Sequence, residues 1–125
     1  MAYTRPDAEL NAEADWFAGR WVEISIHDGD PGTAGTDNEA SGGSYARPTI
    51  SWNAGGAEGP LGASSQPATV GVAYAAPSIP LPAGDWTHYA YWDGSTLRET
   101  GTLSTTYSLA ASGTFQPALA VGPGI

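Results

Sequence analysis

The chain has 125 residues, with 13 Asp and Glu against four Lys and Arg, and a formal net charge of −9. Nucleic-acid binding relies on clustered cations that displace counterions from phosphates, and anionic lipid head groups repel an acidic surface, so we expect neither nucleic acid nor membrane as a partner. The absence of Cys removes disulfides, thiolate nucleophiles and cysteine zinc sites. No secretory signal or long apolar run is recognisable, which predicts synthesis in a cytoplasm.

The length predicts a single domain over residues 1–125. Leu, Ile, Val and Phe are scarce, but the chain has five Trp and six Tyr. Each aromatic side chain can bury about 150–250 Å². We therefore predict a folded domain with a marginal core that gains stability from a neighbouring subunit.

A short helix is predicted within residues 1–19. Thr4 suits the N-cap position, and Gly19 is a natural stop. Ala14 and Phe17 follow one another at helical spacing and indicate the buried face.

In residues 21–27 apolar residues occur at every second position, which predicts a β-strand with one solvent-facing side. The apolar set is Val22, Ile24 and Ile26, and the solvent-facing set is Glu23, Ser25 and His27.

Further short strands are predicted at residues 45–52, 68–75, 86–92, 97–103 and 114–121. The dipeptide Asp93–Gly94 is the sharpest hairpin signal in the chain. Residues 53–66 read as a long Gly/Ser loop, and residues 76–85 as an extended Pro-rich crossing segment.

Short strands separated by turn signals are typical of a β-sandwich or small barrel. We predict a mainly β fold, a single jelly-roll-like β-sandwich of short antiparallel strands over residues 20–125. The helical segment 1–19 precedes it.

The stretch from Ile24 to Arg47 sets a histidine and several acids beside a run of glycines. Its oxygen donors suggest Ca²⁺, and some fall at EF-hand spacing, but Gly32 and Thr33 break that pattern and a strand precedes the loop. A solvated acidic turn is the favoured interpretation, and no metal or cofactor is predicted. The donors considered are His27, Asp28, Asp30, Asp37 and Glu39.

No catalytic residues are predicted. A glycosidase needs two carboxylates across a sugar, and the 13 acids give no reason to choose a pair. A Ser–His–Asp site could draw on His27 or His88, but a G-x-S-x-G elbow is missing from the sequence. His88 shares a predicted face with Trp86 and Trp92, which is more typical of a core or interface histidine.

The strand 86–92 is rich in aromatic residues, and alternation predicts that one set fills the core while the other is displayed. Displayed rings can stack on sugars or anchor a protein interface. The candidate interface aromatics are Trp86, Tyr89, Tyr91 and Trp92.

Four motifs occur in order along nearly the whole chain. They are His27/Asp30/Pro31/Gly32, then Glu39/Gly42/Gly43/Tyr45/Ala46/Arg47, then Thr87/His88/Trp92/Asp93, and last Gly101/Leu103. In this the chain resembles a family of small tailed-bacteriophage virion proteins, labelled tail fibre, minor tail or head-decoration proteins. Pro48 departs from the family pattern and predicts that the strand 45–52 lies at an edge or begins late.

The resemblance implies a non-enzymatic virion protein on the particle exterior, synthesised in the host cytoplasm. We expect capsid decoration or another head-associated role, with a tail or tail-fibre (minor tail) component, able to bind host-surface glycan, as the alternative. The expected partners are other capsid or tail subunits and further copies of the chain, a trimer being one form.

The acidic stretch then becomes a structural loop. Arg47 is expected to pair with Asp28, Asp30 or Glu39, and so to hold the loop that begins at His27 on the following strand.

Overall fold

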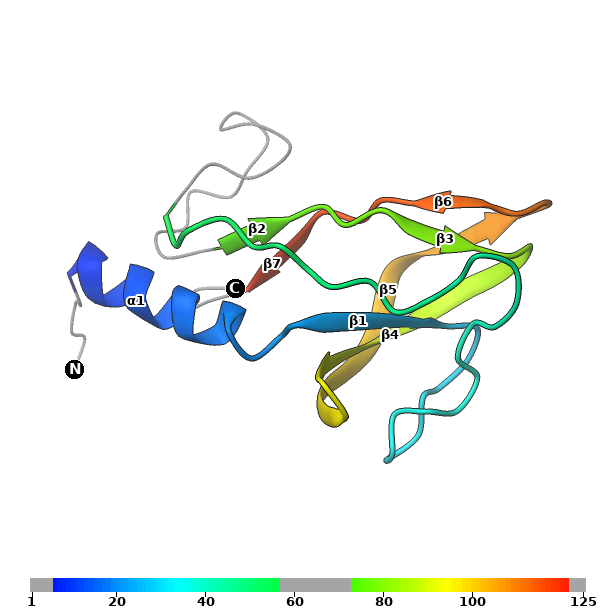
Figure 1. The fold of residues 1–125 in the computed structure, drawn as a ribbon, viewed down its shortest axis with the longest axis horizontal. Helices are drawn as coiled ribbons and strands as arrows, with labels where there is room; N and C mark the ends of the chain where they lie inside the picture. Colours follow the sequence, from blue (N-terminus) through cyan, green and yellow to red (C-terminus); the bar gives the residue numbers. More distant parts are fainter. Residues whose placement is uncertain (1–5, 57–72, 122–125) are drawn as a thin grey trace. The chain divides into compact units, whose positions relative to one another are not determined.

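The computed structural model describes residues 6–56 and 73–121. They form one helix, α1 (Asp7–Ala18), and seven strands in three antiparallel sheets. The strands are β1 (Glu23–His27), β2 (Ala73–Ala75), β3 (Ile79–Leu81), β4 (Gly84–Asp93), β5 (Thr96–Leu109), β6 (Gly113–Phe115) and β7 (Leu119–Val121). The predicted mainly β fold with a short N-terminal helix is confirmed (Figure 1).

The chain forms two compact units. The first is built from the described parts of Met1–Arg20, Ser51–Ala76 and Ala118–Ile125, and the second from Trp21–Ile50 and Pro77–Pro117. That the two behave as one domain stays a prediction, and each unit is described by itself.

In the first unit, α1 packs against the two-stranded sheet β2–β7. Pro6 stands at the N-cap, and Ala14 is the buried residue of the helix. Gly19 ends the helix in a right-handed conformation, so it acts as a stop without the left-handed turn that often requires glycine. The predicted N-cap residue Thr4 lies outside the described residues.

In the second unit, the three-stranded sheet has the order β1–β4–β5, and the ribbon β3–β6 lies over it (Figure 1). Ile24 and Ile26 of β1 and Ile79 of β3 are fully buried, and Leu81 is nearly so. These aliphatic side chains, with the buried Trp86, make up a core between the two layers, as expected for a small β-sandwich.

The hairpin signal at Asp93–Gly94 is confirmed, because β4 and β5 pair across this turn. The turn residues are Gly94 and Ser95, one position later than a turn centred on the Asp–Gly pair, since Asp93 pairs with Thr96. Gly94 has a φ of +62°, as the first central position of a primed hairpin turn requires.

The predicted wet face of β1 is wrong. Ser25 and His27 are as fully buried as Ile24 and Ile26 on the opposite face. The reason is that residues after β1 fold back over this face. Gly35, for example, comes so near that a Cβ there would lie 2.6 Å from Cδ1 of Leu97 on β5.

The strand predicted at residues 45–52 is replaced by an irregular segment with one isolated bridge, Thr49 to Glu23. Pro48 contributes a carbonyl to Ile24 but has no N–H to give, so the segment touches β1 without forming a ladder.

Other predicted segments also differ or lie partly outside the described residues. The strand 114–121 is divided at Pro117 into β6 and β7, which pair with β3 and β2. The crossing segment 76–85 contains β3. Of the predicted strand 68–75, the described part is β2, and residues 57–66 of the predicted loop 53–66 lie outside the described residues.

Gly101 provides a test of the sheet. It lies opposite Tyr89, whose ring covers it, and a Cβ at Gly101 would stand 2.6 Å from Cζ of Tyr89. Gly101→Ala should therefore lower the free energy of unfolding by about 1–3 kcal/mol, because the ring must move. Chemical denaturation measures the loss. In a Tyr89→Ala background the same substitution should cost much less, and an equal cost in both backgrounds would contradict the contact.

Candidate functional site

The segment from Asp28 to Arg47, called here the covering loop, is closed at its base by backbone pairing with β1. His27 and Glu39 form an antiparallel bridge. The N–H of Asp28 donates to the Asn38 carbonyl at 3.0 Å, and the N–H of Ala40 donates to the Ile26 carbonyl at 2.8 Å. The loop therefore leaves and rejoins the sheet at one point, as an Ω-loop does.

Local turns give the loop its own shape. The Asp30 carboxylate accepts the N–H of Gly32 at 2.9 Å, and the N–H of Asp37 donates to the Pro31 carbonyl at 3.0 Å. Pro31 is fully buried. Gly32 has a φ of +75°, and a Cβ there would collide with the Asp37 carboxylate, so glycine is needed at this turn.

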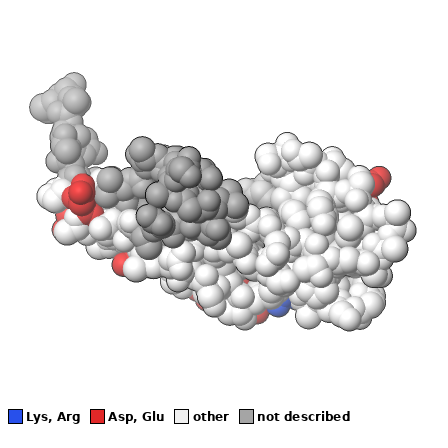
Figure 2. Space-filling model, turned by 90° about the horizontal axis from the view of Figure 1, so that it is seen from above, with Lys and Arg blue, Asp and Glu red and all other residues white. Residues whose placement is uncertain are grey.

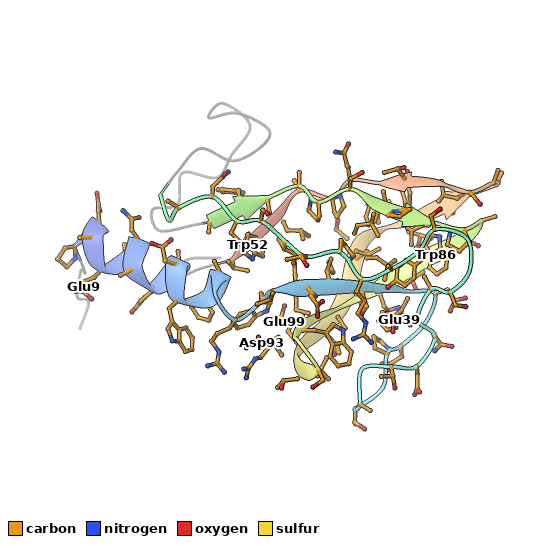
Figure 3. All side chains as sticks on the ribbon, viewed as in Figure 1. Glu9, Glu39, Trp52, Trp86, Asp93 and Glu99 are labelled. Carbon is orange, nitrogen blue, oxygen red and sulfur yellow. The ribbon has the colours of Figure 1, made fainter. Side chains whose placement is uncertain are left out.

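A clamp of four side chains, Glu39, Tyr45, Arg47 and Trp92, fixes the end of the covering loop. Glu39, the carboxylate at its centre, is labelled in Figure 3. Arg47 donates to both carboxylate oxygens of Glu39, from Nε to Oε2 and from Nη2 to Oε1, each at 2.8 Å. Such a two-point pair fixes the orientation of the guanidinium relative to the carboxylate as well as the distance between them. The guanidinium carbon also lies 4.0 Å from the centre of the Trp92 ring, a cation–π contact.

Tyr45 joins the clamp to the backbone of β1. Its hydroxyl donates to Oε2 of Glu39 at 2.9 Å and accepts the N–H of Ile26 at 3.3 Å. A side-chain oxygen thus takes the place of the backbone partner that this N–H would have in a longer ladder.

A buried polar network lies under the covering loop. Nδ1 of His27 is 2.7 Å from the Asp37 carbonyl, which can only accept, so Nδ1 carries the hydrogen. In the neutral ring, Nε2 then accepts from the Ser25 hydroxyl at 2.8 Å. The Oγ of Ser25 in turn accepts the indole N–H of Trp92 at 2.8 Å. Every polar group of the chain Trp92–Ser25–His27 therefore has a partner.

Although Ser25 and His27 are at hydrogen-bond distance, their arrangement is structural. Both side chains are fully buried, so a substrate has no access to Oγ. The third member is a backbone carbonyl rather than a carboxylate. The pair ties β1, β4 and the covering loop together.

The electrostatics of the clamp follow from its burial. Burial raises the pKa of Glu39, but the hydrogen bonds from Arg47 and Tyr45 outweigh it and hold the pKa below its usual value. The hydrogen bond to Glu39 raises the pKa of Arg47. Burial, together with the bond to Glu39, raises the pKa of Tyr45, so its hydroxyl stays protonated and keeps donating.

Of the three acids considered as partners of Arg47, the structure pairs it with Glu39. Asp28 is exposed, and Asp30 is also exposed and caps the turn at Gly32. Within residues 6–56 and 73–121, no group of three or more His, Asp and Glu side chains is placed to hold a metal ion.

Three of the four candidate interface aromatics are buried within the chain, namely Trp86, Tyr91 and Trp92. Tyr89 is partly exposed and meets Tyr91 edge to face, with ring centres 5.2 Å apart. Most of these rings thus fill the core and clamp, which leaves Tyr89 as the ring of this set available to a partner.

Trp16 is the large apolar side chain with the greatest exposure among the described residues, at 57%. The guanidinium of Arg20 lies 4.7 Å from its ring centre, and Phe17 meets it edge on. Trp16 received no role in the sequence analysis.

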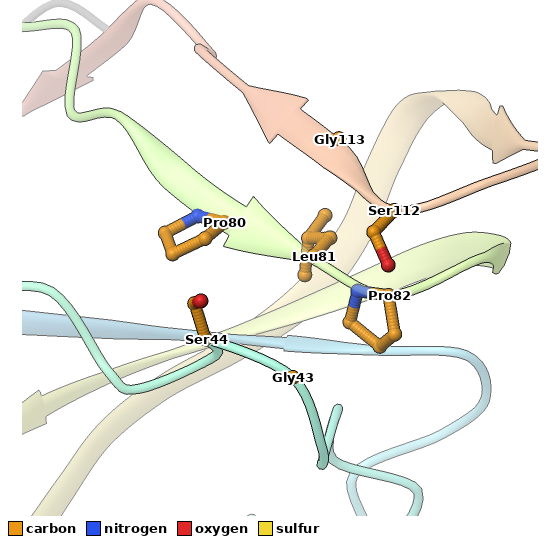
Figure 4. A pocket seen from close by; sticks show the side chains of 7 residues that line it. All are labelled: Gly43, Ser44, Pro80, Leu81, Pro82, Ser112 and Gly113. Carbon is orange, nitrogen blue, oxygen red and sulfur yellow. The ribbon is translucent and has the colours of Figure 1, made fainter.

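A shallow pocket of about 240 Å³ lies between the covering loop and the β3–β6 ribbon (Figure 4). Its lining is two prolines, a leucine, two serines and two glycines, so it offers hydroxyls but no ionisable group. The lining residues are Gly43, Ser44, Pro80, Leu81, Pro82, Ser112 and Gly113. Seen from above the view of Figure 1, the described residues show few Lys, Arg, Asp or Glu side chains at the surface (Figure 2).

One of the residues that hold the site, Ser25, belongs to none of the four motifs. The alternation of β1 places Ser25 and His27 on one face, and the pairing of β1 with β4, in which Glu23 lies opposite Trp92, places Trp92 on that face too. The shared face of Ser25, His27 and Trp92 is therefore the feature from which the buried network could have been predicted, once β1 was paired with β4.

Comparison with known protein families gives a match. The model of the family described as podophage GP4 fiber I protein gp80 matches residues 3–120. No curated protein and no solved structure matches. In the described part of the chain, no helix is long and apolar enough to cross a membrane.

Removing the guanidinium tests the clamp. Arg47→Ala leaves Glu39 half-buried without its cation, and it should lower the free energy of unfolding by about 2 kcal/mol. Arg98→Ala is the matched control, because Arg98 makes a single 3.1 Å bond to the more exposed Asp93 and should cost well under about 1 kcal/mol. Thermal unfolding compares the two variants. Equal losses of stability in the two variants would show that the two-point pair stabilises the fold no more than the single bond of Arg98 does.

Acid provides a second test of the clamp. The pKa of Glu39 is lowered in the folded state. Its contribution to the free energy of unfolding is therefore fully present above pH 4.5 and is lost as the pH falls through the lowered pKa. The wild type should therefore lose more stability below pH 4.5 than Glu39→Gln. Denaturant midpoints of both proteins across this range measure the difference. Parallel curves would contradict a titrating clamp.

Proposed function

The chain belongs to the family of the podophage GP4 fiber I protein gp80, and on that premise we propose that it is a fibre subunit on the exterior of a bacteriophage virion, attached to other tail proteins. The observation that carries the proposal is the family match, which extends over residues 3–120 and so includes both units. The match favours the tail or tail-fibre role over capsid decoration, the role first expected from the sequence.

The internal chemistry supports a non-enzymatic role. The residues with the greatest catalytic potential in the second unit are committed to internal bonds, His27 to Ser25 and Asp37, and Glu39 to Tyr45 and Arg47. Such bonds stabilise a loop on a sheet and occupy most of the hydrogen-bonding capacity of these groups. The chain therefore acts through its shape and surface.

Surface charge supports an external position. At −9, a subunit facing packaged DNA would meet phosphate repulsion, whereas a fibre meets solvent and other proteins. A host-glycan role would need displayed rings, and of the strand 86–92 aromatics only Tyr89 is partly exposed.

Electron microscopy of the intact particle tests this proposal. We expect gold-labelled antibody against the chain to bind at the tail, and the density of the β1–β4–β5 sheet to fit a tail-fibre map. Labelling spread over the capsid lattice would replace the fibre role by capsid decoration. Labelling of neither structure on intact particles would reject an external position.

A further inference from the structure

The pocket beside the covering loop belongs entirely to the second unit, and it is small. Its lining comes from the covering loop, from β3 and the residue after it, and from the start of β6 and the residue before it. Its volume of about 240 Å³ lies below the roughly 300–1,000 Å³ of pockets that enclose a drug-sized ligand. A space of this size suits one large side chain.

The pairing of β3 with β6 decides which backbone groups of β3 face outward. In an antiparallel ladder, residues that bond to the partner strand alternate with residues whose N–H and C=O point the other way. Pro80 has no N–H, so its neighbours Ile79 and Leu81 must be the positions that bond to β6. The carbonyl of Pro80 therefore points away from β6, toward the outer edge of β3.

This outer edge of β3 is unsuited to the addition of a strand. A strand that paired there would need N–H donors from the outward positions, and Pro80 and Pro82 hold these positions without an N–H. The Pro82 carbonyl is also occupied, because it accepts the indole N–H of Trp86 at 3.2 Å. The edge therefore disfavours an extended peptide, the usual ligand of an open sheet edge.

The lining combines apolar side chains with uncharged oxygen atoms. Leu81 is 2% exposed, and Pro80 and Pro82 are half-buried. The side chain of Ser44 points toward Pro80, and that of Ser112 points toward Pro82 (Figure 4). Within residues 6–56 and 73–121, neither hydroxyl and not the Pro80 carbonyl bonds to another part of the chain. The pocket thus offers hydrogen-bond acceptors beside an apolar surface.

This lining favours a neutral aromatic side chain as the occupant. Trp, Tyr and Arg are the residues that most often anchor protein interfaces from within a pocket. An Arg would be buried here without a carboxylate, since no ionisable residue lines the pocket. Tyr and Trp each bring an apolar ring and one polar hydrogen, which needs an acceptor once the ring is buried. The carbonyl of Pro80 is such an acceptor.

The walls of the pocket are held in place by the chain itself. On one side, proline rings fix the backbone of β3. On the other, the N–H of Tyr45 donates to the Gly42 carbonyl at 3.2 Å, and the clamp bonds Tyr45 and Arg47 to Glu39. Ser44 therefore lies between anchored residues. A preformed pocket reduces the conformational entropy that is lost on binding.

We propose that this pocket is the docking site for one tyrosine or tryptophan side chain, displayed on a loop of a partner protein. Its ring packs on Pro80, Leu81 and Pro82, and its O–H or N–H donates to the Pro80 carbonyl. That the partner is a tail protein rests on the proposed function. The pocket is a property of the free chain, so the binding test below and the labelling of particles can fail independently.

Titration of the isotope-labelled chain with N-acetyl-tyrosinamide, followed by NMR, tests the pocket directly. We expect the backbone amide signals of Ser44, Ser112 and Gly113 to shift with a Kd of about 1–10 mM, as befits one anchor without the rest of its interface. N-acetyl-phenylalaninamide lacks the hydroxyl and should bind about fivefold more weakly, because it cannot donate to the Pro80 carbonyl.

A matched pair of variants locates the binding. Ser44→Trp puts an indole into the pocket from its own wall and should weaken the binding of N-acetyl-tyrosinamide by about tenfold or more. Ser41→Trp changes an exposed serine of the same loop outside the lining and should leave binding unchanged. The amide spectrum shows whether each variant is folded, and Ser112→Trp repeats the test from the opposite wall if Ser44→Trp does not fold.

The same two variants test the partner. Purified particles should lack the Ser44→Trp subunit and retain the Ser41→Trp subunit, as immunoblots of the particles measure. Normal incorporation of Ser44→Trp would show that no tail protein uses the pocket.

Several results of the titration would overturn the proposal. Shifts confined to other parts of the chain, or unchanged binding by folded Ser44→Trp, would show that the pocket is not the site. Equal binding of the two amides would exclude the hydrogen bond to the Pro80 carbonyl. Shifts at the pocket with glucose or galactose but with neither amide would assign the pocket to a sugar instead.

Discussion

The two-point pair between Glu39 and Arg47 is the interaction on which the second unit depends. Without it, the covering loop would be held over β1 by the backbone pairing at its base and by the hydrogen bond from His27 to the Asp37 carbonyl. With it, Tyr45 is positioned to accept the N–H of Ile26, and Trp92 is covered on one face by the guanidinium. The side chain of Arg47 remains 26% exposed and that of Glu39 19% exposed. Removing the two charges from water therefore costs less free energy than in a fully buried ion pair.

The clamp also explains why a polar face of β1 is tolerated in the interior. Ser25 and His27 would be costly to bury singly, because each has groups that need partners. The covering loop brings the Asp37 carbonyl to His27, and β4 brings the indole of Trp92 to Ser25. This chain is poor in Leu, Ile and Val and fills its core with aromatic residues. Trp92, one of these, also gives a buried polar atom its hydrogen-bond partner.

The sequence is informative where local chemistry decides the structure. The helix, the β4–β5 hairpin and the aromatic strand were predictable, because helical spacing, turn and alternation signals act over a few residues. The burial of Ser25 and His27 was not, since it depends on a loop whose path is set by Gly32, Gly35 and the Glu39–Arg47 pair. The choice of Glu39 over Asp28 and Asp30 likewise depends on the bridge between His27 and Glu39, which no spacing rule supplies.

Sealing one edge of a sheet determines how that sheet can assemble. If both β1 and β5 were open, each copy could add the next at either side, and the sheet would grow without limit, as aggregating edge strands do. The clamp removes the β1 edge from this choice, because the groups that would recruit a neighbour already bond to Tyr45, Pro48 and Ala40. The ion pair that fixes the covering loop therefore also keeps the β1 edge from pairing with another strand.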